Sequence, residues 1–131
     1  MRVLLSTMLM TGVLVSAAAA QSRDALTVLE RSDTSEPGQE VVAAVDEVAP
    51  GARAAWHRHP GTMVAFVAEG VVTVEREGAA AVTYGAGESF TVPAHAAHSS
   101  VNEGTSAARM FVTFIVPKQQ PLTTRVRPSA R

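Results

Sequence analysis

The chain has 131 residues, with 11 basic and 12 acidic side chains and a formal net charge of −1. That balance gives no basic stripe for nucleic acid and no polybasic patch for a membrane surface. The chain also has no cysteine, which excludes disulfides, thiolate chemistry and cysteine-ligated zinc or iron–sulfur sites.

Residues 1–20 have the composition of a signal peptide. Arg2 precedes an uncharged apolar run that extends to Val15, and the alanines at 17–20 supply the small residues of a cleavage site. The run is shorter than the ~20 apolar residues of a transmembrane anchor, and no cluster of charges follows it. We therefore expect an exported protein, periplasmic or secreted, whose mature chain begins near Gln21 and has no membrane association.

The rest of the chain is expected to form one all-β domain with polar ends. Residues 21–40 are expected to be an N-terminal arm, with a short strand at 25–29 and a loop at 32–38. Short apolar or alternating runs closed by glycine or proline then predict an all-β sandwich or barrel over 41–117, with little helix. These runs are 41–48, 62–68, 71–75, 81–84, 89–92, 99–101 and 107–116. Residues 118–131 are expected to be an extended or disordered tail.

All four histidines lie in two short segments, and three of them have the spacing of metal ligands. His57 and His59 are separated by one residue, so on an extended segment both imidazoles face the same side. A third imidazole from a neighbouring strand, His98, would complete a facial metal site with open positions. The alternative is that these are surface or core histidines without a metal.

The two segments resemble the two sequence motifs of the cupin superfamily. The positions that match are Gly51, His57, His59 and Gly70 in the first motif, and Gly87, Pro93, His98 and Asn102 in the second. The resemblance covers residues 41–116 and implies a double-stranded β-helix, or jelly-roll barrel. It also implies one divalent transition metal ion (iron, manganese, copper, nickel or zinc) on His57, His59 and His98.

Two positions depart from these motifs. Met63 stands where the first motif has a glutamate, and His95 stands where the second has a glycine. The motif glycine implies a turn with a positive φ angle at His95, and histidine is among the non-glycine residues enriched in that conformation. Without the carboxylate, a divalent ion on three neutral imidazoles keeps its full formal charge and should favour anionic ligands. Met63 either ligates through its thioether, which suits copper(I), or only lines the pocket. Met63, His95 and Phe66 are the candidate residues of a substrate pocket.

These features predict metal-dependent binding of, or chemistry on, a small anionic molecule inside the barrel, and the best-specified enzyme is a dioxygenase. The alternative is a non-catalytic periplasmic protein that binds copper or zinc or senses a ligand. The resemblance also implies a homodimer. Because unpaired strand edges are usually covered, residues 25–29 are a candidate for strand pairing across the subunit boundary.

Overall fold

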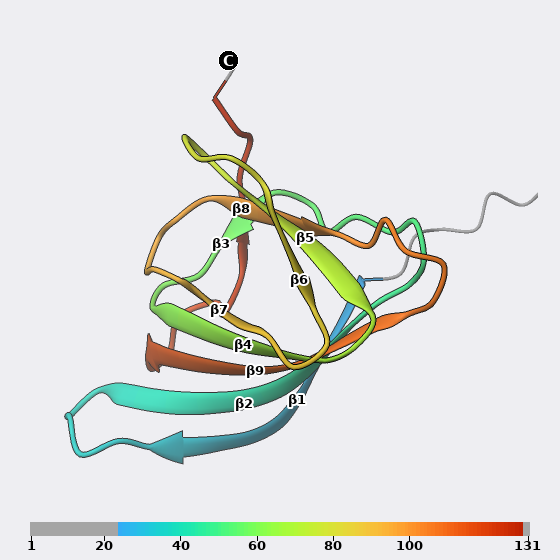
Figure 1. The fold of residues 1–131 in the computed structure, drawn as a ribbon. Coiled ribbons are helices and arrows are strands. Elements are labelled where there is room, and N and C mark those ends of the chain that lie inside the picture. The colour runs from blue at the N-terminus through green and yellow to red at the C-terminus, as the bar shows by residue number, and fades with distance from the viewer. Residues whose placement is uncertain (1–23, 130–131) are drawn as a thin grey trace, which may run out of the picture.

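The computed structural model describes residues 24–129, which form two five-stranded antiparallel sheets (Figure 1). One sheet has the strand order β1-β2-β9-β4-β7, and the other has the order β10-β3-β8-β5-β6. The strands are β1 (Asp24–Asp33), β2 (Gln39–Val48), β3 (His57–Arg58), β4 (Thr62–Glu69), β5 (Val71–Arg76), β6 (Val82–Gly85), β7 (Ser89–Val92), β8 (His98–Val101), β9 (Ala108–Pro117) and β10 (Thr124–Arg125). The expected all-β double-stranded β-helix is confirmed.

None of the described residues belongs to a helix long and apolar enough to cross a membrane. The predicted signal peptide, residues 1–20, lies outside the described part of the chain.

Strict alternation of buried and exposed side chains along β9 sets the inner face of the first sheet. Phe114 points inward and is 1% exposed, whereas Phe111 points outward and is 49% exposed. Odd and even positions of a strand face opposite sides, so only one of these two rings can reach the interior. The inward side chains of β2, β4, β5, β7 and β9 join in one apolar core, whose largest members are Phe114, Phe90, Met110 and Met63.

Asn102, the last residue of the second motif, connects the loops at one end of the barrel. Its side-chain amide is fully buried and donates hydrogen bonds to the carbonyls of Val48 (2.9 Å) and Ser106 (2.8 Å). Its Oδ1 accepts from the Gly104 N–H (2.9 Å), and its backbone carbonyl accepts from the Gly51 N–H (2.8 Å). With every polar group paired, Asn102 fixes the ends of β2 and β8 and has a structural role.

The N-terminal strand is confirmed and is longer than expected. β1 pairs with β2 of the same chain, from Asp24 opposite Val48 to Asp33 opposite Glu40, with one irregularity after Val28. The loop that was expected to begin at 32 therefore begins after Asp33. Polar residues at the end of β1 remain in the strand because this hairpin lies at the sheet edge, where Arg31 forms an ion pair with Glu40. Residues 25–29 thus find their partner within the chain, and the homodimer stays a prediction.

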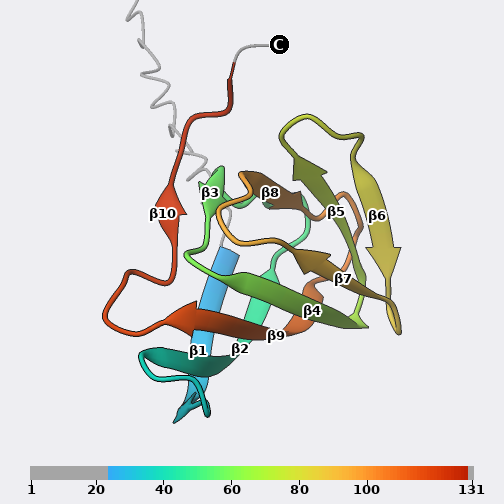
Figure 2. The ribbon, with the colours of Figure 1, turned by 90° about the vertical axis from the view of Figure 1, so that its left-hand side faces the viewer.

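The C-terminal segment is also more ordered than the expected tail. It is mostly without regular structure, but Thr124 and Arg125 form β10, which pairs with Arg58 and His57 of β3 (Figure 2). β3 has only β8 on its other side, so its free edge accepts this strand. A polar, proline-containing sequence gives no sign of such a non-local pairing.

Candidate metal centre

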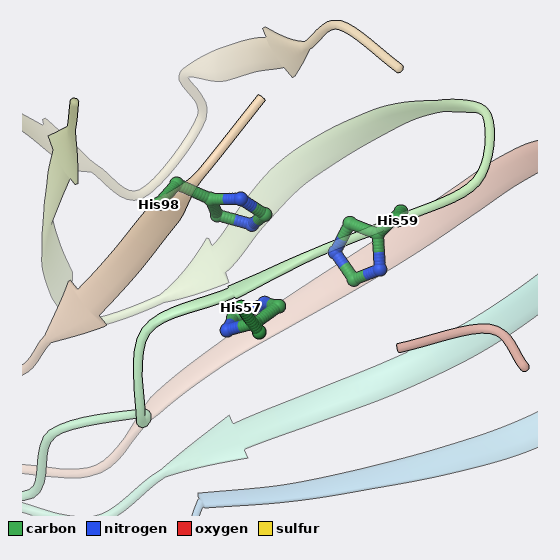
Figure 3. Close-up of side chains that lie close together, drawn as sticks. All are labelled: His57, His59 and His98. Atoms are coloured by element: carbon green, nitrogen blue, oxygen red, sulfur yellow. The ribbon is translucent and has the colours of Figure 1, made fainter. Parts of the chain in front are cut away.

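Three histidines from two neighbouring strands meet inside the barrel (Figure 3). His57 in β3 lies directly opposite His98 in β8, and His59 follows β3 by one residue. The ring centroids are 4.2 Å apart for His57 and His98, 4.9 Å for His57 and His59, and 5.0 Å for His59 and His98. One nitrogen of each ring lies within 4.8 Å of the others, so a single ion can contact all three.

Backbone carbonyls fix the protonation of all three rings in the same way. The Nδ1 atoms of His57, His59 and His98 lie 2.7, 2.8 and 3.0 Å from backbone oxygens, which belong to Ala55, Leu122 and Ala96 respectively. A carbonyl oxygen only accepts, so each Nδ1 carries the proton and donates it, which leaves the lone pair on Nε2. Metal-binding histidines commonly donate their second nitrogen to such a group. The three side chains are therefore prepared to ligate through Nε2.

The Nε2 atom of His59 is buried and has no hydrogen-bond partner. Leaving a buried polar atom unsatisfied costs about 1–3 kcal/mol. A divalent transition metal ion shared with His57 and His98 would satisfy this atom, and imidazole nitrogen is a good ligand for zinc, copper, iron and nickel. The donor set therefore fits the implied metal.

Burial keeps two of the rings neutral at physiological pH. Loss of solvation lowers the pKa of His59 to about 4, and the hydrogen bond to Leu122 only partly opposes this. The pKa of His98 is also lowered to about 4, first by burial and then by electrostatic repulsion from His57. Since only neutral imidazole ligates, the fold holds both side chains in their ligating form.

The histidines open onto a cavity of about 280 Å³. This volume lies near the lower end of the range for small-molecule sites, so the cavity suits a small ligand. The polar part of its wall, besides the histidines, consists of Asp46, Ser100, Thr123 and Arg125. The apolar part consists of Leu26, Ala55, Met63, Ala65, Phe90, Met110, Val112 and Phe114.

Comparison with known proteins agrees with this architecture. Residues 44–114, more than half of the chain, match the family model for the cupin domain. The chain belongs to the cupin superfamily. No curated protein sequence matches this cupin.

Solved structures with the same fold include a cupin superfamily protein from Desulfitobacterium hafniense (16% identity, TM-score 0.60, covering 75% of this chain and 82% of that one). A DMSP lyase from Ruegeria pomeroyi has 18% identity and a TM-score of 0.68, over 89% of this chain and 58% of that one. An oxalate oxidase in complex with the substrate analogue glycolate has 26% identity and a TM-score of 0.64, over 89% of this chain and 63% of that one. This cupin thus spans less than two thirds of the lyase and of the oxidase.

Of the three predicted pocket residues, only Met63 lines the cavity of this cupin. Phe66 was wrongly expected there: it points outward from β4 and is 45% exposed, because the buried positions of that strand are Met63, Ala65 and Val67. His95 does have the expected positive φ (63°), but its side chain is exposed and outside the cavity wall. Its backbone N–H donates to the His59 carbonyl (2.9 Å), so His95 contributes through its main chain.

The structure adds four polar residues to the cupin cavity that the sequence analysis missed: Asp46, Ser100, Thr123 and Arg125. Asp46 could have been found, since it has the same parity in β2 as the buried Val42, Ala44 and Val48. Thr123 and Arg125 follow the region matched by the family model, and no sequence signal places them beside the histidines.

Proposed function

We propose that this protein is an exported cupin that holds one divalent transition metal ion on His57, His59 and His98 and oxidises a small carboxylate anion with dioxygen. The observation that carries the proposal is that three Nε2 atoms converge at the wall of a small cavity with further polar groups. Three protein ligands leave coordination positions for a substrate and for dioxygen.

The charge and size of the cavity favour a small anion. Neutral imidazoles leave the formal charge of a divalent ion uncompensated, and Arg125 adds a further positive charge against the single carboxylate of Asp46. A volume of about 280 Å³ is compatible with a small ligand. The similarity to an oxalate oxidase that binds glycolate supports a carboxylate of this size.

Each part of the cavity wall has a role in such a reaction. The apolar side chains of Phe90, Met110 and Phe114 exclude water, which strengthens electrostatic interactions inside. Asp46 is a carboxylate that can accept a proton from a substrate hydroxyl or carboxyl group. A bound redox-active metal ion would supply Lewis acidity and electron transfer.

Oxygen consumption tests the proposal. The mature protein is loaded separately with manganese(II) and iron(II) and mixed with oxalate, with glycolate or with the neutral amide of glycolate. We expect oxygen uptake with a carboxylate and one of the metals, none with the amide, and none in the His57→Ala/His98→Ala variant. Binding of both carboxylates to the loaded protein without any oxygen uptake would contradict the oxidase and favour the ligand-sensing alternative.

Met63 favours one other function, the handling of copper, because its side chain lines the same cavity as the histidines. We expect Met63 only to line the cavity wall. Met63→Leu, which roughly conserves volume, should therefore leave the affinities for copper(I) and zinc almost unchanged. Met63→Glu restores the carboxylate of the motif; it should raise the affinity for manganese(II) or iron(II) and weaken anion binding. Titration with each metal checks both variants. A selective loss of copper(I) affinity in folded Met63→Leu would show that the sulfur ligates.

A further inference from the structure

The C-terminal strand places a cation in line with the metal ligands. Arg125 of β10 lies opposite His57 of β3, and His57 lies opposite His98 of β8. Residues directly opposite one another in antiparallel strands point to the same face, with Cβ atoms about 4.5–5.5 Å apart. Arg125 therefore lies on the same face as two of the histidines, and its side chain, which is exposed, lines the cavity.

Hydrogen bonds on both sides of Arg125 hold its backbone in place. The Leu122 carbonyl accepts from Nδ1 of His59 (2.8 Å), and the Val126 N–H donates to the Trp56 carbonyl (2.9 Å). The segment is thus fixed to Trp56, which directly precedes His57, and to the side chain of His59. The backbone position of Arg125 is therefore determined by contacts with the residues around the histidines.

Arg125 differs from most cations of this protein in having no partner of its own. Among residues 24–129, its guanidinium makes no hydrogen bond or ion pair. Arg58 and Arg127 are also without a partner in that range, but neither lines the cavity, whereas the exposed side chain of Arg125 does. The ion pairs of the described residues use other cations: Arg31 with Glu40, Arg53 with Glu75, Arg109 with Glu47, and Lys118 with Asp33.

We propose that Arg125 is the substrate-selecting residue of this cupin and binds one carboxylate of the ligand, an inference that rests on the proposed function. A guanidinium presents a planar pair of donors that matches a carboxylate. A ligand held in this way keeps a second oxygen group directed toward His57, His59 and His98. The substrate class is accordingly a small anion with two oxygen functions, a dicarboxylate or a 2-hydroxy acid.

Anion binding to the cobalt(II)-loaded protein, followed by visible absorption, separates this role from catalysis. Charge-assisted hydrogen bonds contribute enough that Arg125→Gln should raise the dissociation constant of glycolate and of oxalate about tenfold or more. Arg127→Gln removes the same charge from the same segment and should leave both constants within twofold of wild type. Binding of glycolamide should be almost unaffected by either change. Cobalt content is expected to be equal in all variants.

Arg125→Lys distinguishes the loss of a direct contact between Arg125 and the anion from a loosening of β10. It keeps the charge but loses the paired donors, so it should recover part of the lost affinity, whereas mere loosening of β10 would not be rescued. Equal dissociation constants for wild type and Arg125→Gln, or equal losses in Arg125→Gln and Arg127→Gln, would overturn the inference and leave the metal-dependent function standing. If neither anion binds to the cobalt-loaded wild type, the proposed function fails as well.

Discussion

Replacing His98 with alanine should lower the affinity for a divalent transition metal about a hundredfold or more. His98 is 1% exposed and supplies one of three converging nitrogens, so its replacement leaves two ligands and a cavity in place of the third ring. Removal of a group that merely orients a ligand already costs 10–100-fold in affinity. Competition with a chelator of known affinity, at constant pH and ionic strength, measures the change.

His95 provides the matched control for this variant. It lies three residues before His98 in the same connection, but its side chain is exposed and outside the cavity. His95→Asn keeps a residue that tolerates the positive φ of this position and should bind metal as the wild type does. A His98→Ala protein that retains its metal affinity to within a few-fold, or an equal loss in both variants, would contradict the assignment.

Metal-free protein should lose stability as the pH is lowered from 6.5 to 5, a window above that of most carboxylates. Burial lowers the pKa of His59 and of His98 to about 4, whereas histidines of the unfolded chain titrate near about 6.5. Between these values the unfolded state binds more protons than the folded state, so the free energy of unfolding decreases as the pH is lowered. The contribution of the two buried neutral rings to the free energy of unfolding is fully present above pH ~6.5 and is lost as the pH falls toward ~4.

Thermal unfolding of metal-free protein across this window checks the prediction. The double variant His59→Gln/His98→Gln, in which neither side chain titrates, should show a flatter dependence on pH. The same low pKa values mean that protons displace the metal from these two ligands only toward pH 4, lower than the value near 6.5 expected for ordinary imidazoles. A pH dependence as steep in the double variant as in the wild type would show that other groups titrate.

The three-histidine cluster could be predicted from the sequence because it depends on local spacing. His57 and His59 share a face by alternation alone, and the register of the two motifs brings His98 opposite His57. The facing of β4 was not readable in the same way: residues 62–68 are almost uniformly apolar, so no alternation showed that Phe66 points outward. In β9, the opposite parity of Phe111 and Phe114 allows only one of the two rings to face the interior, but the sequence, which is apolar at both parities, does not show which one.

The polar residues of the cavity wall differ in whether a local pattern could have identified them. Asp46 could have been assigned from its parity in β2. Arg125 and Thr123 could not, because a proline-containing polar segment gives no period and its position depends on pairing with a strand more than sixty residues earlier. Non-local pairing is decided by which sheet edge remains free, and only the assembled fold shows that edge.

The metal content of purified mature protein tests the central claim most directly. After loading and removal of excess metal, elemental analysis should find about one transition-metal ion per wild-type chain and almost none in His57→Ala/His98→Ala. Circular dichroism of both proteins shows that each is folded. Full metal occupancy in the folded double variant would contradict the three-histidine site and the function proposed from it.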